Sequence, residues 1–336
     1  MAHFATNRFN YWAQLGILAA FCGVGLILGG LLSIIPLMGK VDIFKLKDGS
    51  AALMDTLLKP ENATAMRWMQ LITTTFLFFI PPVMYAWICH VKAFKHLGFK
   101  NQIDLKQVGF IILIVLAASP AVDMLQQLTQ MLPWSKATLA KFKIAEDDYF
   151  KQVMVIARMN NFGDYIISMI MVALLPAVFE ETLFRGGLQN LFSRWFKMPV
   201  LAIVMTSIIF SAIHGSYLGF LSRFALGFVL GWVYYRTGNI WLNIIAHFFN
   251  NGLALTSLYF SSSRGTKMDP SKMEEHFPIW VGLISIAIVV VLFIYFDKIS
   301  KDKSDRPGEE VLMPYYNFNN NPFEKDIATT DQPAQH

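Results

Sequence analysis

The chain has 336 residues, of which 55% are hydrophobic and 15% are charged. Soluble domains carry charge on about a quarter of their residues, and the apolar residues here fall in long blocks. The composition therefore excludes an ordinary soluble protein and predicts a polytopic membrane protein embedded in a lipid bilayer. The net charge of +5 comes largely from lysines beside the apolar blocks, so we expect no nucleic-acid partner.

The apolar blocks predict an all-α bundle of about eight transmembrane helices. Most of them reach the roughly 20 residues that a helix needs to cross the hydrocarbon core. In chain order, the blocks are Tyr11–Met38, Trp68–Ile88, Val108–Leu125, Phe162 to about Arg194, Pro199–His214, Tyr217–Tyr235, Ile240–Phe260 and Phe277–Phe296.

Residues 126–161, between the third and fourth blocks, mix apolar and charged side chains at roughly helical spacing. This pattern favours one or two amphipathic helices in the membrane interface, and an ordinary surface loop equally well. Residues 301–336 are polar and rich in Asn and Pro, which predicts a disordered tail after a membrane domain of residues 1–300.

Basic residues predict the orientation in the membrane. They crowd the loop after the second block and the segment after the last one, which the positive-inside rule assigns to the cytoplasm. These residues are Lys92, Lys95, Lys100 and Lys106, and Lys298, Lys301, Lys303 and Arg306. An even number of spans then places both termini inside, and we expect a multi-pass protein of the cytoplasmic membrane.

Three glycine pairs with helical spacing predict close helix packing. They are Gly25-x-x-x-Gly29, Gly215-x-x-x-Gly219 and Gly227-x-x-x-Gly231.

The fourth block carries three charges, Glu180, Glu181 and Arg185. Each costs on the order of 2.5–3.5 kcal/mol at the centre of a bilayer, so all three need partners. Glu181 and Arg185 are four residues apart in the favourable order and predict an ion pair. Glu180 lies about 100° round the helix and faces elsewhere. Its natural partner is a histidine or a metal ion at the same depth.

The spacing places His214 at that depth. The apolar pattern continues past Gly186 and predicts that the fourth helix runs to about Arg194, before a turn that ends at Pro199. Glu180 then lies about fifteen residues before the turn and His214 about sixteen after it, both roughly 22–24 Å away. This expectation fails if the helix breaks at the Gly186-Gly187 pair.

His247 and Asn251 share one helix face, four residues apart. His247 lies about nine residues past the turn at 236–238, which places it within the membrane. A single intramembrane histidine is more often a packing residue. A glutamate, two histidines and an asparagine on three helices instead favour a functional site.

The sequences "EETLFR", "FSAIH" and "HFFNN" match the motifs E-E-x-x-x-R, F-x-x-x-H and H-x-x-x-N, in that order. On these motifs, a core of about residues 163–260 resembles the CPBP (Abi) family of intramembrane proteases, which includes the CAAX prenyl endopeptidase of the Ras-converting type. The resemblance implies that Glu180 and His214 activate a water molecule. His247 and Asn251 would stabilise the oxyanion or hold a metal, with Glu181 and Arg185 as structural support or substrate-positioning residues.

Peptide hydrolysis needs a base, a held water and an electrophile for the developing charge. A carboxylate and an imidazole supply the base, and hydrogen-bond donors or zinc supply the electrophile. Two histidines and a carboxylate suit catalytic zinc. We expect zinc near Glu180, His214 and His247, with a metal-free mechanism as the alternative, and a membrane-associated protein or peptide as substrate.

Two other functional classes stay open. A transporter or ion-relay protein also buries Glu, His and Arg, and Arg158, Arg223 and Asp123 could line its path. The absence of repeated halves in the sequence argues against it. The second is a non-catalytic scaffold or immunity member of the family, against which the intact set of motifs argues.

Overall fold

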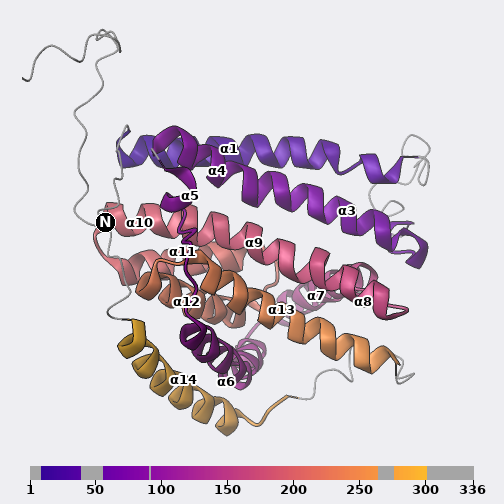
Figure 1. The fold of residues 1–336 in the computed structure, drawn as a ribbon. Coiled ribbons are helices and arrows are strands. Elements are labelled where there is room, and N and C mark those ends of the chain that lie inside the picture. Colours follow the sequence, from indigo (N-terminus) through magenta and orange to yellow (C-terminus); the bar gives the residue numbers. More distant parts are fainter. Residues whose placement is uncertain (1–8, 39–55, 91, 264–275, 301–336) are drawn as a thin grey trace, which may run out of the picture.

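The computed structural model describes residues 9–38, 56–90, 92–263 and 276–300. Within these residues every regular element is helical, and the long helices run side by side in one bundle (Figure 1). The predicted all-α bundle is therefore confirmed, and each of the eight apolar blocks forms a helix. The predicted polar tail, 301–336, lies outside the described residues.

The helices follow the order of the apolar blocks. They are α1 (Tyr11–Leu32), α3 (Ala63–Thr74), α4 (Ile80–Cys89), the short α5 (Ala93–His96), α6 (Leu105–Met131), α7 (Lys136–Ile156), α8 (Phe162–Ser168), α9 (Leu175–Glu181), α10 (Asn190–Phe196), α11 (Pro199–Ile213), α12 (Phe220–Thr237), α13 (Ile240–Ser263) and α14 (Ile279–Ser300). Together, α8, α9 and α10 form one continuous rod.

Five helical segments in the described residues are long and apolar enough to cross a membrane. They are Tyr11–Leu37, Pro60–Cys89, Leu105–Met131, Phe162–Phe196 and Ile279–Ser300. The remaining three predicted blocks form α11, which is apolar but shorter, and α12 and α13.

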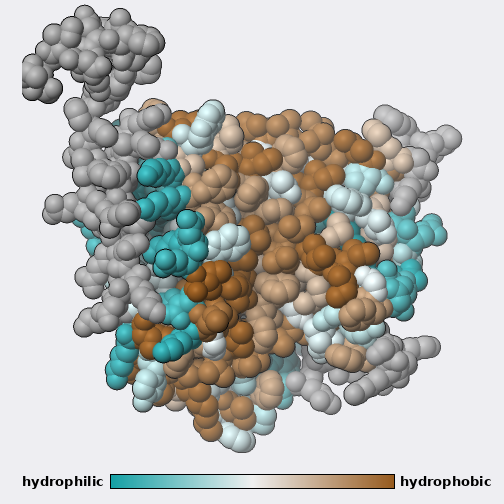
Figure 2. Space-filling view, viewed as in Figure 1, coloured by the Kyte–Doolittle hydropathy of each residue, from teal (hydrophilic) through white to brown (hydrophobic). Residues whose placement is uncertain are grey.

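The surface of the bundle fits lipid. Large apolar side chains such as Ile27 and Leu31 on α1, and Leu283 and Val290 on α14, are exposed. Figure 2 shows apolar side chains across the middle of one face and polar side chains toward its left and right edges, which are the two ends of the helices in Figure 1. Such a broad apolar surface is unsuited to water, so the protein is an integral membrane protein.

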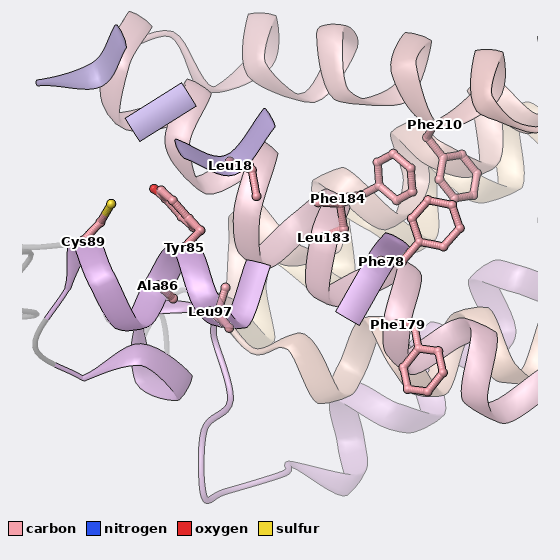
Figure 3. Packing of buried hydrophobic residues seen from close by; sticks show 10 residues of the cluster. All are labelled: Leu18, Phe78, Tyr85, Ala86, Cys89, Leu97, Phe179, Leu183, Phe184 and Phe210. Carbon is pink, nitrogen blue, oxygen red and sulfur yellow. The ribbon is translucent and has the colours of Figure 1, made fainter. Parts of the chain in front are cut away.

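The rod of α8 to α10 lies inside the bundle and contacts helices from both halves of the chain, including α3, α4, α11 and α13. Aromatic side chains fill much of the space between this rod and its neighbours (Figure 3). The Phe184 ring packs near both Phe78 and Phe210, at centroid distances of 5.9 and 5.0 Å. Phe210 also borders the polar cluster described below, so the core and the candidate site share a wall.

In the described ranges, three π-helical segments widen the helices, at Thr75–Phe79, Met169–Leu174 and Thr182–Gln189. The first two each end two residues before a proline, and the prolines are Pro81, followed by Pro82, and Pro176. Proline has no N–H and its ring clashes with the carbonyl four residues earlier, which a wider turn accommodates. The third contains the Gly186-Gly187 pair. The helix widens there without breaking, so the rod runs to Phe196, two residues past the predicted end.

Two of the three glycine spacings are packing contacts. A Cβ on Gly25 would lie 2.0 Å from the Phe76 carbonyl oxygen, and one on Gly231 would lie 2.8 Å from the Ile203 side chain. The prediction was wrong for Gly215, which lies in the turn after α11. Its φ of +66° is in the left-handed region, and a Cβ there would have no neighbour within 4 Å among the described residues. Gly215 therefore lets the chain turn and makes no helix contact.

The segment between the third and fourth blocks is helical for most of its length. Helix α6 continues to Met131, six residues past the predicted Leu125, and α7 then forms a single helix. The Ser135 hydroxyl caps α7 by accepting from the Thr138 N–H at 3.1 Å. A helix is thus confirmed over the loop alternative, as one helix, while its placement in the membrane interface stays a prediction.

The two ends of the bundle hold different features (Figure 1). One end holds the start of α1, where the Tyr11 ring stacks on Trp195 at 6.1 Å. It also holds the end of α14, where the Ser300 hydroxyl accepts from the Gln107 amide at 3.0 Å. The opposite end holds α7 and the turn of residues 214–219. The first and last described helices thus have their outer ends on the same side of the bundle.

Candidate active site

Glu181 and Arg185 form the predicted ion pair. Glu181 is the last residue of α9, and Arg185 lies in the π-helical segment that follows. The Arg185 Nη1 donates to Glu181 Oε1 at 2.9 Å, and both side chains are almost completely buried. The Arg185 Nη2 donates to the Gly227 carbonyl on α12 at 3.0 Å. One guanidinium therefore neutralises the carboxylate and joins the rod to α12.

Glu181 also holds His247, which the sequence did not predict. The same Oε1 atom accepts from Nδ1 of His247 on α13 at 2.8 Å. A carboxylate can only accept, so Nδ1 carries the proton and Nε2 is left to face other groups. The role predicted for Glu181, a partner of Arg185, was therefore incomplete. Spacing along one helix reveals neighbours on that helix and gives no signal for a contact between α9 and α13.

Glu180 faces the two histidines. Its Oε2 lies 3.7 Å from His214 Nε2 and 3.8 Å from His247 Nε2. These separations are too long for direct hydrogen bonds but suit a bridging water at about 2.8 Å from each atom. Oε2 is buried and has no hydrogen-bond partner in the described part of the chain. A buried carboxylate oxygen between two imidazoles is therefore ready to bind a third group.

His214 lies at the depth that the spacing predicts. It directly follows the last residue of α11, and its Nδ1 donates to the Phe210 carbonyl at 2.7 Å. This bond leaves Nε2 directed at Glu180. The Phe210 ring lies between the polar groups, with centroids 4.7 Å from the His214 ring and 6.0 Å from the His247 ring. The guanidinium of Arg185 lies 5.0 Å from the same ring.

Asn251 lies on the same helix as His247 but is not hydrogen-bonded to this cluster in the described part of the chain. It is half-buried on α13, one turn after His247. Its Oδ1 accepts from the neighbouring Asn250 amide at 3.4 Å. Among the described residues it makes no hydrogen bond to Glu180, His214 or His247. Asn251 shares a helix face with His247, so it is placed beside the cluster as the spacing predicts.

The donor atoms at the cluster are of the kind that zinc prefers, namely two imidazole Nε2 atoms and a carboxylate oxygen. Each imidazole has its Nδ1 held by an acceptor, as in many zinc sites. Within the described residues, however, no three His, Cys, Asp or Glu side chains already stand together as ligands of one ion. The chemistry of the donors fits zinc, while the side chains would need to move together to hold it.

The residues considered for an ion path have separate local partners. The Arg223 guanidinium lies 5.2 Å from the Tyr149 ring, and Arg158 donates to Asn160. Asp123 accepts from His276 Nδ1 at 2.7 Å. In the described residues, no hydrogen bond links any of the three to Glu180 or its histidines. This arrangement does not support a relay through them.

The fold and the cluster define a polytopic α-helical membrane protein with a buried Glu–His–His constellation. Residues 162–253 match the family model described as type II CAAX prenyl endopeptidase Rce1-like. The resemblance inferred from the three motifs is confirmed over this segment.

Two curated proteins are each similar to this chain over a segment of comparable length to that of the family match. YpbD of Bacillus subtilis (strain 168), an uncharacterized protein, is 35% identical over 104 residues, which cover 30% of this chain and 50% of YpbD. An uncharacterized 24.3 kDa protein of Escherichia coli is 31% identical over 92 residues, which cover 26% of this chain and 42% of that protein. The chain thus spans half or less of the length of these relatives. No solved structure matches it.

Proposed function

We propose that this protein is an intramembrane endopeptidase that hydrolyses a peptide bond in a membrane-associated protein or peptide. The observation that carries the proposal is the position of Glu180 Oε2, buried between the Nε2 atoms of His214 and His247. Both imidazoles are oriented by acceptors at Nδ1. The family match over residues 162–253 supports the same reaction class.

In the proposed reaction, a water molecule binds between Glu180 and His214. Glu180 takes a proton from it as the water oxygen attacks the substrate carbonyl carbon. The carbonyl oxygen becomes an oxyanion, which His247, as an imidazolium beside the Glu181 carboxylate, and Asn251 stabilise by hydrogen bonds. The C–N bond then breaks, and the proton held at Glu180 passes to the leaving amine.

Glu181 and Arg185 hold this machinery in place. Glu181 Oε1 fixes the His247 ring at 2.8 Å, and Arg185 keeps the charge of Glu181 balanced at 2.9 Å. A metal-assisted form of the proposal uses the same residues. Glu180, His214 and His247 would hold zinc, which when bound supplies a Lewis acid for the carbonyl oxygen.

We also propose that the bundle end containing the start of α1 faces the cytoplasm, in the cytoplasmic membrane. The support is the lysine-rich segment at that end, which includes Lys92, Lys95 and Lys100. Helix α7 and the 214–219 turn would then lie toward the outer face.

The proposal is tested with the purified protein in lipid vesicles. The probes are a CAAX peptide with and without a farnesyl group and a set of transmembrane peptides, with cleavage followed by mass spectrometry. Glu180→Gln should lower the rate by about 10²–10⁴-fold, the usual contribution of a general base. His214→Ala and His247→Ala should also abolish most cleavage. Glu61→Gln is the matched control, because it makes the same change at an exposed position.

Wild-type cleavage rates in all three site variants would refute the assignment. An ion-relay protein would give a different pattern. Its vesicles would show a proton flux that Glu180→Gln abolishes, without cleavage of any probe.

A further inference from the structure

The turn of residues 214–219 decides where His214 lies. His214 is the first residue after α11, and Gly215 at φ +66° takes the chain out of the helix. The hydrogen bond of the ring, from Nδ1 to the Phe210 carbonyl, reaches back to the last turn of its own helix. The distance between His214 Nε2 and Glu180 therefore depends on what holds the rest of the turn.

One carboxylate from a distant part of the chain holds this turn. Oε1 of Glu146, on α7, accepts from the Ser216 hydroxyl and from the Leu218 N–H at 3.3 Å. The Ser216 oxygen in turn accepts from the Gly219 N–H at 3.1 Å, and Ser216 is buried. A single side chain thus satisfies two donors of the turn.

Helix α7 approaches the turn with one face. Phe142, Glu146 and Tyr149 are spaced four and three residues apart, which places them on one side of the helix. The Phe142 ring stacks on Tyr217 at 4.5 Å with an interplanar angle of 13°. Tyr149 lies 5.2 Å from the guanidinium of Arg223, at the start of α12. Glu146 therefore makes the middle one of three contacts that this face of α7 makes with the turn and the start of α12.

Helix α7 is itself anchored to the bundle, although none of its residues is buried. The buried Arg67 on α3 donates to the Ile156 carbonyl at 2.8 Å and to the Arg158 carbonyl. The last carbonyls of a helix lack partners within it, and a cation there is favourable. Arg67 therefore fixes the end of α7 at the end of the bundle where α8 begins (Figure 1).

We propose that Glu146 is a positioning residue. Through Ser216 and Leu218 it fixes the turn of residues 214–219, and through that turn it holds His214 Nε2 against Glu180. The inference rests on the proposed function, because the position of His214 matters most if the ring acts in catalysis. A misplacement of about 1 Å in a catalytic group can cost about a hundredfold in rate.

The test compares Glu146→Ala, Glu146→Gln and Ser216→Ala with Asp147→Ala. Asp147 is the exposed neighbour on the same helix and serves as the matched control. Two quantities are measured on the full chain in vesicles. They are hydrogen exchange of peptides covering residues 214–219, and kcat and KM for the farnesylated CAAX peptide.

Glu146→Ala should speed exchange in the turn and lower kcat by about 10- to 100-fold, with KM within about twofold. Glu146→Gln should recover most of the loss, because its amide oxygen still accepts hydrogen bonds. Asp147→Ala should match the wild type. The double variant Glu146→Ala/Ser216→Ala should lose little more kcat than Glu146→Ala alone, since both substitutions break the same connection.

Wild-type exchange and kcat in Glu146→Ala would overturn the inference, and so would an equal loss in Asp147→Ala or full additivity with Ser216→Ala. A wild-type protein that cleaves no probe would refute the proposed function instead. In that case the hydrogen exchange of residues 214–219 alone tests this inference. Faster exchange confined to the Glu146 and Ser216 variants would support Glu146 as the residue that fixes the turn. Unchanged exchange in these variants would refute that role.

Discussion

Replacing Arg185 by methionine tests the buried charge network on which the site depends. Arg185 is 1% exposed and its partner Glu181 is 0% exposed. The substitution keeps a long apolar side chain but removes the bonds to Glu181 at 2.9 Å and to the Gly227 carbonyl at 3.0 Å. It leaves the buried Glu181 carboxylate without the guanidinium and with the His247 ring as its remaining partner.

The expected loss of stability is large. Hydrogen bonds to charged groups contribute about 1.5–3 kcal/mol each, and breaking one side of a buried ion pair costs about 3–5 kcal/mol. We therefore expect Arg185→Met to lower the free energy of unfolding by about 3–5 kcal/mol. Adding Glu181→Gln removes the stranded charge, so the double variant should recover about 1–3 kcal/mol of that loss.

The assay is denaturant unfolding in mixed micelles, followed by tryptophan fluorescence. Arg236→Met is the matched control, since Arg236 pairs with Asp297 at 2.7 Å in a partly exposed position. An ion pair of that kind contributes about 0–1 kcal/mol. The reasoning would be refuted if Arg185→Met lost no more stability than Arg236→Met, or if Glu181→Gln made the loss greater.

Two further predictions concern packing and the metal. Gly25→Ala should destabilise the bundle by about 1–3 kcal/mol through overpacking, because its Cβ would lie 2.0 Å from the Phe76 carbonyl oxygen. Gly30→Ala, with no neighbour within 4 Å in the described residues, should be as stable as the wild type; similar unfolding midpoints for both variants would contradict the packing argument. A strong chelator should abolish cleavage of the peptide probes and zinc should restore it, whereas cleavage that neither reagent changes would support the metal-free mechanism.

The helices were predictable because a bilayer leaves the backbone few choices. A chain in hydrocarbon must satisfy its N–H and C=O groups internally, so a long apolar block forms a helix. The ends were less well predicted, and α6 runs to Met131 instead of Leu125. A helix can continue past the end of an apolar block, because polar residues such as Gln126 and Gln127 form the same backbone hydrogen bonds.

The depth of the site was also predictable, for a geometric reason. Glu180 and His214 lie on two helices joined by a short turn, and a constant rise per residue gives equal distances from that turn. The observed separation of 3.7 Å agrees with the prediction. The prediction required the helix to continue through Gly186-Gly187, and the helix does so as a π-helical segment.

The sequence by itself determined that the apolar blocks are helices, which charges lie within them, and the Glu181–Arg185 pair, because all of these follow from spacing along a single helix or a single turn. Only the tertiary structure decided that Glu181 also binds His247, that Glu180 faces both imidazoles, and that Glu146 reaches the turn of His214. These contacts depend on how far each helix is rotated and tilted against its neighbours. The rotations are set by side-chain packing across the whole bundle, which spacing along the chain does not encode.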